Sequence, residues 1–248
     1  MTVVTAEFIK KHKDLINEGK WEELYNQDTG NFQIYGDLTV TLLEAGIDPL
    51  QTMTTMPAEY FRASNITEYT VPSHVNIIGT KAFAECMELD TVHLPDDLLF
   101  IDYGAFEEST LQSITLPESL TYIKDEAFAA TLLTSITIPN QVKIIPSYCF
   151  EESALRSIRL GAGVKHIQDR AFGECRKLKY VDLNEGLSHI YDYAFVECTE
   201  LDSLYIPASV TRIGDSAFHR CKNLVIQCEE ESYAHQYAVS HKIDYQLV

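Results

Sequence analysis

The sequence predicts an α/β solenoid, a stack of about seven to eight coils of 22–23 residues with parallel strands, a helical N-terminal cap and a short C-terminal cap. The main observation is a phenylalanine that recurs every 22 or 23 residues along most of the chain. A leucine column and aliphatic residues at period two accompany it, which is typical of a short strand with one buried face. The phenylalanines are Phe61, Phe83, Phe106, Phe128, Phe150, Phe172, Phe195 and Phe218.

Each unit follows one pattern, of which LTYIKDEAFAATLLTSITIP (residues 120–139) is an example. Proline ends most of the strands, because it has no amide N–H to continue a ladder. One unit cannot bury its own apolar face, so we expect neighbouring coils to stack at the strand spacing of about 4.8 Å. A side-chain oxygen of Thr, Ser or Asp two positions before the Ala-Phe or Cys-Phe pair predicts a capped helical turn in every copy except that of Tyr103. These residues are Thr80, Asp125, Ser147, Asp169, Asp192 and Asp215.

The units IGTKAFAECMELDTVHLP (78–95) and IGDSAFHRCKNL (213–224) resemble the BspA-like leucine-rich repeats, whose pattern has Ala-Phe, Cys, Leu and Ile-x-Leu-Pro at these spacings. The resemblance covers about residues 56–228, with seven full copies. It implies a curved solenoid that binds proteins or other surfaces and has no catalysis of its own. Many relatives of this kind are secreted or surface-anchored.

The two ends depart from the repeat and predict three segments in all. Residues 1–49 are predicted to be a helical N-terminal cap, with a first helix from Thr5 to Gly19. Residues 50–228 form the solenoid, and residues 229–248 a C-terminal capping segment that is helix-like from about Ser232 to Ser240. An open alternative is that the N-terminal module contacts a partner through its aromatic residues Trp21, Tyr25, Phe32 and Tyr35.

Charge and composition limit the partners. The formal net charge is -18, from 37 acidic and 19 basic residues. Such a field repels phosphate backbones and anionic membranes, so we expect neither nonspecific nucleic-acid binding nor a membrane partner. No segment approaches the roughly 18 apolar residues of a membrane span, and charges interrupt the N-terminal apolar runs, which together predict a cytoplasmic protein. Oligomeric state cannot be predicted from these features.

The candidate chemical motifs are weak, so the sequence predicts no metal, no cofactor and no enzyme. Cys221, Cys228, His235 and His241 have the wrong spacing for a zinc finger. Four of the six cysteines share a repeat position with Ser and Thr in other copies, which predicts small buried side chains and not disulfides. The usual hydrolase, metalloprotease and phosphate-binding motifs are not found.

Two outer columns of the predicted stack have open interpretations. The first carries His166 and His189 on neighbouring coils, and we expect these imidazoles to be exposed. Its earlier members either pack under the turns or form an outward apolar stripe, which would mark a contact surface; they are Ile77, Phe100, Tyr122 and Ile144. The second column is an acidic ladder, predicted to be a solvated face or to meet a basic partner; it contains Glu85, Glu108, Glu152, Glu174 and Glu197.

The strand face that points away from the core is the predicted recognition surface, by the resemblance and by the geometry of a concave sheet. Its early coils carry small, nearly uniform residues, whereas its later coils diversify into Tyr and Arg, which often dominate interface energetics. The candidate partner-binding residues are Arg156, Arg159, Lys179, Tyr180, Asp182 and Tyr205, with His93 on an earlier coil.

The leading functional prediction is therefore a non-catalytic protein–protein interaction scaffold that binds a protein partner through this concave strand face. One alternative is an acidic inhibitor, encoded by a phage or mobile element, that blocks a nucleic-acid-binding protein by occupying its basic groove. Another alternative is an extracellular adhesin-type repeat protein, as the resemblance implies.

Overall fold

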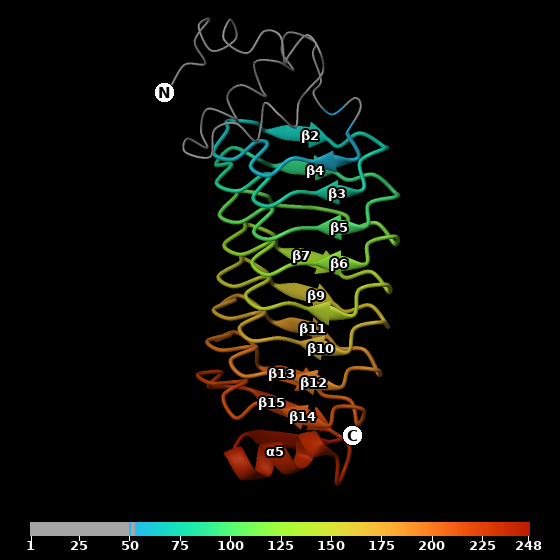
Figure 1. Cartoon of the computed structure of the whole chain (residues 1–248). Helices are drawn as coiled ribbons and strands as arrows, with labels where there is room; N and C mark the ends of the chain where they lie inside the picture. The colour runs from blue at the N-terminus through green and yellow to red at the C-terminus, as the bar shows by residue number, and fades with distance from the viewer. Residues whose placement is uncertain (1–49, 51–52) are drawn as a thin grey trace, which may run out of the picture.

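The computed structural model describes residue 50 and residues 53–248, which form an elongated stack of coils closed at one end by a helix (Figure 1). The predicted solenoid is confirmed, because each of the eight phenylalanines belongs to one coil and a closing turn follows, giving about nine turns. The predicted N-terminal cap, with its helices and its four aromatic residues, lies outside the described residues.

Each coil has three sides, of which two carry short strands. Every strand pair is parallel, and it joins one coil to the next. The front face contains β2 (Glu68–Thr70), β4 (Thr91–His93), β7 (Ser135–Thr137), β9 (Ser157–Arg159), β11 (Tyr180–Asp182), β13 (Ser203–Tyr205), β15 (Val225–Cys228) and β16 (Asp244–Leu247). The back face contains β1 (Thr55–Met56), β3 (Ile77–Ile78), β5 (Phe100–Ile101), β6 (Tyr122–Ile123), β8 (Ile144–Ile145), β10 (His166–Ile167), β12 (His189–Ile190) and β14 (Arg212–Ile213).

Side chains alternate along these strands as period two requires. In β9 the central Ile158 is buried and Arg159 is exposed, and in β8 Ile145 is buried while Ile144 is exposed. The front and back faces therefore each present outward columns of side chains that run along the stack. Residues of one column come from successive coils in register, as His166 and His189 do.

The back-face ladder is interrupted between β6 and β8, and a single residue explains the break. In the other coils the residue after the strand donates its amide to the previous coil, as Lys124 does to Ile101 and Gln168 to Ile145. Pro146 occupies this position after β8 and has no N–H to donate. Four strands therefore pair on each side of the break, β1-β3-β5-β6 and β14-β12-β10-β8.

The third side of each coil is a turn side whose backbone conformation differs from the predicted helical turn. Residues that flank the phenylalanines adopt left-handed conformations, with φ near +50 to +66° at positions such as Lys81 and Glu85. Every second amide then points to the next coil, so that Lys81, Phe83 and Glu85 donate to Tyr103, Ala105 and Glu107. The predicted helix cap is correspondingly wrong for Asp192, since its carboxylate accepts the amide of Ser216 from the next coil at 3.1 Å.

The core is a ladder of stacked phenylalanine rings with aliphatic residues on either side. From Phe83 to Phe218 successive ring centroids lie 5.1–5.5 Å apart and the rings are within 16° of parallel. Tyr237 closes the ladder with an edge-on contact to Phe218 at 6.1 Å. Each ring is buried by its own coil and its two neighbours, so the coils depend on each other for stability.

The closing turn contains α5 (Tyr233–His241), the one α-helix among residues 53–248, which lies across the last coils (Figure 1). Ser232 caps it by accepting the His235 amide at 3.2 Å, and Lys242 ends it in a left-handed conformation. Ala234, Tyr237 and Ala238 form its buried side. The chain then returns to pair β16 with β15.

The predicted burial of the cysteine column is confirmed for Cys86, Cys175 and Cys198, whereas Cys221 is half-buried. All six cysteines are free thiols, and five of them are buried. In the repeat column each thiol donates to the carbonyl of the phenylalanine of the preceding coil, as Cys175 does to Phe150 at 3.0 Å. Burial raises the pKa of the Cys175 thiol to about 12, so this column supplies packing and one hydrogen bond per coil.

Candidate functional site

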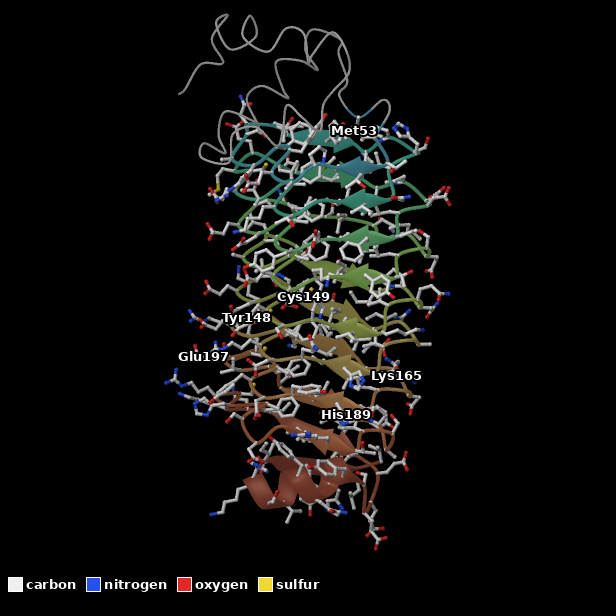
Figure 2. All side chains as sticks on the ribbon, in the orientation of Figure 1. Met53, Tyr148, Cys149, Lys165, His189 and Glu197 are labelled. Carbon is white, nitrogen blue, oxygen red and sulfur yellow. The ribbon has the colours of Figure 1, made fainter. Side chains whose placement is uncertain are left out.

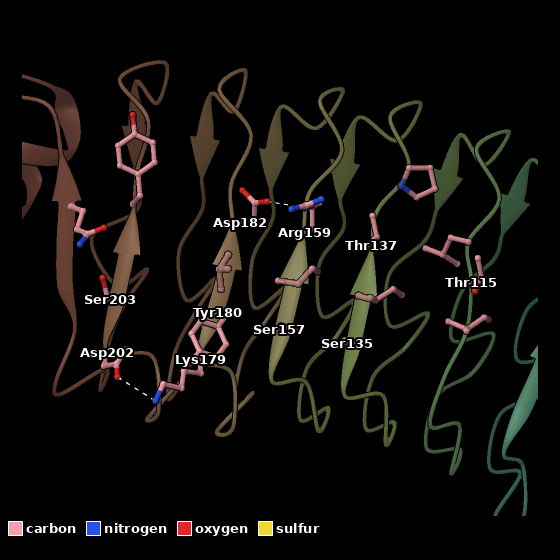
Figure 3. A pocket seen from close by; sticks show the side chains of 18 of the residues that line it. Thr115, Ser135, Thr137, Ser157, Arg159, Lys179, Tyr180, Asp182, Asp202 and Ser203 are labelled. Carbon is pink, nitrogen blue, oxygen red and sulfur yellow. Dashed lines mark hydrogen bonds and ion pairs between the residues drawn. The ribbon is translucent and has the colours of Figure 1, made fainter. Parts of the chain in front are cut away.

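The candidate site is a shallow hollow on the front face, which we call the front hollow. Its volume is about 890 Å³, and its lining residues come from six successive coils, from Ile114 to Gln227 (Figure 3). Outward residues of β7, β9, β11 and β13 line it, so its walls are set by the strand register. The lining includes Thr115, Ser135, Thr137, Ser157, Arg159, Lys179, Tyr180, Asp182, Asp202, Ser203, Tyr205 and Gln227.

Two ion pairs link neighbouring coils in the front hollow (Figure 3). The guanidinium Nε of Arg159 lies 2.8 Å from the carboxylate of Asp182, and the ammonium of Lys179 lies 3.7 Å from that of Asp202. All four side chains are largely exposed, at 71%, 59%, 45% and 57% of their side-chain area. Exposed pairs of this kind contribute little to stability, so their groups remain available for exchange with a ligand's charges.

Two tyrosines give the front hollow its aromatic surface. Tyr180 is 65% exposed, and the ammonium of Lys179 lies 5.8 Å from its ring centroid. Tyr205 is half-buried, and its pKa is raised by burial and then by the carboxylates of Glu185 and Glu229. The phenol of Tyr205 is therefore a neutral hydrogen-bonding group near pH 7.

The structure brings together five of the seven predicted site residues. Arg159, Lys179, Tyr180, Asp182 and Tyr205 all line the front hollow. Arg156 and His93 do not. Arg156 is exposed directly before β9, whereas His93 lies on β4, where its ring nitrogen is 3.1 Å from the carboxylate of Glu68.

Asp202 was missed by the sequence reasoning, although a signal for it exists. It follows Arg156 and Lys179 in the column directly before each front strand, one coil further along. Aligning charges of opposite sign in that column predicts the Lys179–Asp202 pair. The serines were weak candidates in sequence because a single hydroxyl carries little information, and only their register as a row makes them a surface.

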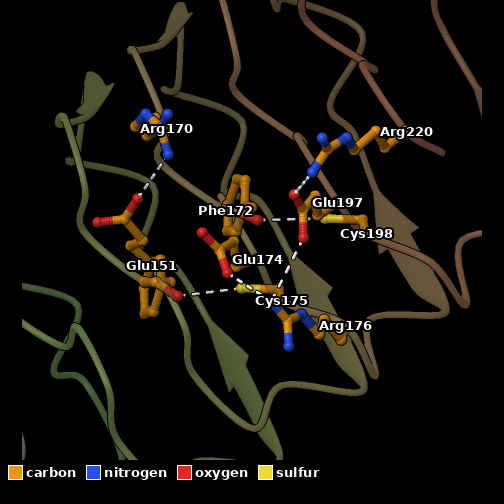
Figure 4. Close-up of polar contacts among 10 residues, drawn as sticks. Glu151, Arg170, Phe172, Glu174, Cys175, Arg176, Glu197, Cys198 and Arg220 are labelled. Carbon is orange, nitrogen blue, oxygen red and sulfur yellow. Dashed lines mark hydrogen bonds and ion pairs between the residues drawn. The ribbon is translucent and has the colours of Figure 1, made fainter.

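The predicted acidic ladder lies on the turn side, where several of its glutamates form ion pairs with arginines (Figure 4). Arg176 bridges Glu174 and Glu197 at 2.7 and 3.3 Å, and Arg220 also pairs with Glu197. These arginines lower the pKa of Glu197, with the hydrogen bond from Arg220 as the largest cause. At the other end Arg62 holds Glu85 at 2.6 Å. Much of this ladder is thus internally neutralised and is a poor imitation of a nucleic-acid backbone.

The chemistry available in the front hollow is that of recognition. Hydroxyls, an amide, two phenols and two opposed ion pairs can bind a partner's polar groups and aromatic or aliphatic side chains. Within residues 53–248, no group of three or more His, Cys, Asp or Glu residues is placed to hold a metal ion. No helix in that same part is long and apolar enough to cross a membrane.

Comparison with known proteins agrees with the architecture. A leucine-rich repeat protein from Eubacterium ventriosum is similar in structure with a TM-score of 0.57 and 24% identity, over 66% of this chain and 46% of that one. The leucine-rich repeat protein of T. pallidum has a TM-score of 0.52 and 25% identity, over 78% of each chain. This chain thus spans less than half of the Eubacterium protein. No curated protein gives a significant match.

The family model that matches describes the BspA type leucine-rich repeat region, in six copies over residues 54–179 and 143–234. These residues include every coil from β2 to β15. The matched repeats are the same units that stack their phenylalanines in the core, and no enzyme family matches. The chain belongs to the BspA-type leucine-rich repeat family.

Proposed function

We propose that this protein is a non-catalytic scaffold that binds a protein partner through the front hollow. The observation that carries the proposal is the concentration of exposed aromatic and charged side chains in one concavity. Tyr180, Arg159 and Lys179 lie on adjacent coils there, in contrast to the hydroxyl-rich rows of the earlier coils. Tyrosine and arginine are the residues that most often supply binding energy at protein interfaces.

The chemistry of the front hollow favours a partner surface that offers both charges. Arg159 and Asp182 present one cation and one anion side by side, and Lys179 with Asp202 repeats the arrangement. A partner with alternating charges can insert its own groups between them, and the exposed ring of Tyr180 then packs on an apolar side chain. The remaining residues of the front hollow contribute hydrogen bonds from their hydroxyl groups and shape complementarity.

The test is capture of partners from lysate of the source organism on immobilised full-length chain, followed by mass spectrometry and binding of each purified candidate. Arg159→Glu combined with Tyr180→Ala is expected to weaken the true partner by about 2–4 kcal/mol, which lies in the range of interface hot spots. The matched control is Tyr122→Ala, which removes a tyrosine of nearly equal exposure, 61% against 65%, from the opposite face.

Loss of the partner with the front variant and retention with Tyr122→Ala supports the front hollow. Equal affinity for wild type and the front variant would show that the partner binds elsewhere. Circular dichroism melting curves of both variants verify that the coils remain folded, since all three side chains lie outside the core.

A further inference from the structure

The back face carries a group of basic side chains without acidic partners, on a protein whose formal net charge is -18. Lys124, Lys143, Lys165 and Arg212 are exposed there, directly before, on or after the back strands. None of these four cations enters an ion pair with a described residue. Lys165 donates only to the carbonyl of Gly186, at 3.0 Å. Their charge is therefore available to a ligand.

The acidic residues of the molecule are largely kept off this face. The outward residues directly before, on and after the back strands β3, β5, β6, β8, β10, β12 and β14 include a single carboxylate, Asp102. It already accepts from Thr80 at 3.0 Å and from the Tyr103 amide at 2.8 Å. Salt screens fields beyond about 8 Å at physiological ionic strength, so a ligand on this face experiences the local cations more than the distant acidic sides. Lys165 and the acidic side at Glu197 project from opposite sides of the column (Figure 2).

Apolar and aromatic side chains continue the same face toward the N-terminal coils. Leu99, Tyr122 and Ile144 are 46%, 61% and 39% exposed, and the rings of Phe100 and Tyr122 lie 5.8 Å apart on adjacent coils. The ammonium of Lys124 lies 5.8 Å from the Phe100 ring centroid. The predicted outward stripe is thus real for Tyr122 and Ile144, which do not pack under the turns.

The basic side chains and rings of the back face also have a regular spacing along the stack. Lys143 and Lys165 occupy the same position on adjacent coils, as their strands β8 and β10 pair in register, and His166, His189 and Arg212 follow one another in the next column. Adjacent coils repeat at the strand spacing of about 4.8 Å. A linear ligand that lies along the stack therefore meets one cation or one ring per coil.

We propose that the back face binds a linear acidic polysaccharide that lies along the solenoid axis. The apolar C–H faces of sugar rings fit the half-buried ring of Phe100 and the exposed ring of Tyr122, and the carboxylates of the sugars fit the cations Lys124, Lys143, Lys165 and Arg212. An extended acidic peptide rises about 3.3 Å per residue and goes out of register with the coils. Duplex nucleic acid carries a charge about every 1.7 Å along its axis, a density that four cations cannot neutralise on so acidic a protein.

The test measures binding of sodium polygalacturonate to the full chain by calorimetry at low and physiological salt. Lys143→Glu combined with Lys165→Glu is expected to weaken binding about tenfold or more, and Tyr122→Ala a few-fold, as lost ionic and stacking contacts predict. The matched control is Lys177→Glu with Lys222→Glu, the same change of net charge at two exposed lysines outside this face. It is expected to change the affinity less than about twofold.

A second measurement uses the unaltered protein and so does not depend on the folding of variants. Lysine acetylation in the presence of polygalacturonate is expected to spare Lys124, Lys143 and Lys165, and to modify Lys177 and Lys222 as in the free protein. Equal protection of all five lysines overturns the proposal, as does unchanged affinity of the Lys143→Glu, Lys165→Glu variant.

Three further ligands distinguish the alternatives. Fully methyl-esterified pectin, which has the same rings without charge, must bind much more weakly. If poly-L-glutamate or duplex DNA binds as tightly as polygalacturonate, the ligand of this face is an acidic peptide or a nucleic acid. Either result would overturn the proposal. The front variant Arg159→Glu, Tyr180→Ala must retain polygalacturonate binding, so that failure here is separable from failure of the proposed function.

Discussion

The front and back faces of the solenoid rest on the same phenylalanine ladder but treat their charges differently. On the front face Arg159 and Lys179 each lie beside a carboxylate of the next coil, whereas on the back face Lys143 and Lys165 lie beside each other. Across the repeat coils the backbone lattice is nearly equivalent, with one short parallel strand per coil on each face, except that the front position at Ser113 forms a single bridge. The difference therefore lies only in the outward columns, and it separates a surface neutralised within itself from one that needs an external anion.

This contrast also explains how one short repeat can carry two surfaces. An inward column is constrained by the packing of three coils, but an outward column is constrained only by its neighbours in register. Like charges stacked in register, such as Lys143 and Lys165, disfavour each other modestly. Within the described residues no ion pair offsets this repulsion, and we therefore interpret the back-face cations as functional.

The strongest perturbation of both faces together is Phe128→Ala, in the middle of the ladder. Removal of this fully buried ring is expected to lower the free energy of unfolding by about 3–5 kcal/mol, through lost burial and the cavity left behind. Urea denaturation measures it. Since both faces share the core, front and back ligands should lose affinity together near the midpoint; loss on one face alone would contradict the single ladder.

A smaller, pH-dependent effect separates the back face from the front. The pKa of His166 is lowered from its usual 6.5 by burial and by the neighbouring His189. Between the lowered folded value and 6.5 the unfolded chain binds more protons, so stability falls as the pH drops through that window. His166→Ile, which copies the residue of this column at Ile144, should flatten the melting temperature between pH 7 and 5. If the His166→Ile variant keeps the wild-type dependence of the melting temperature on pH, another titrating group causes that dependence.

The front ion pairs should contribute less still. A double-mutant cycle of Arg159→Ala and Asp182→Ala is expected to give a coupling of about 0.2–1 kcal/mol in unfolding free energy, because both side chains are exposed. The single Asp182→Ala change tests the comparison directly. It leaves Arg159 unpaired as the back-face cations are, so the front face should gain weak affinity for polygalacturonate, and no gain would mean that pairing is not what distinguishes the faces.

The smallest expected effect concerns the break in the back ladder. Pro146→Ala supplies an amide that can donate to the carbonyl of Ile123, as Lys124 does to Ile101 one coil earlier. The new hydrogen bond and the greater freedom of the unfolded chain are each about 1 kcal/mol and oppose each other, so stability should hardly change. Hydrogen exchange should nevertheless show slow exchange of the amide introduced at position 146, and fast exchange would mean that the coils are separated there for another reason.

Sequence predicted the repeat and the core because periodicity reports directly on burial, and it named five of the residues that line the front hollow. The columns that contain Phe128 and Ile136 recur at a fixed spacing because each coil has one buried side. Tyr180 and Arg159 are recognisable because they differ from the small, uniform residues of the earlier coils. Whether the column of Tyr122 and Ile144 points outward was left open by the sequence. In the sequence, an aromatic or aliphatic residue that is covered by a turn cannot be distinguished from one that faces solvent. Only the coordinates give its exposed fraction.

The backbone of the turn side could not be predicted from residue types. Left-handed conformations favour Gly and Asn, yet these positions hold residues such as Lys81, Glu85 and Glu108. Among the turn-side residues from 53 onward, one position alone has the expected residue, Gly104 with φ +56°. The hydrogen bonds to the next coil outweigh the local preference, a long-range effect that is invisible in a window of sequence. The missed Asp202 has the same origin, since its importance comes from Lys179 one coil away.

The turn side finally gives the whole column a direction. Along it Phe61, Phe83 and Phe106 donate their amides only toward the following coil, and the flanking left-handed residues do the same. The peptide dipoles of this side therefore add up along the axis, as they do in a helix, and a terminal coil exposes N–H groups at the C-terminal end but carbonyl groups at the N-terminal end. The two ends of such a stack need caps of opposite hydrogen-bonding character, and neither cap can replace the other.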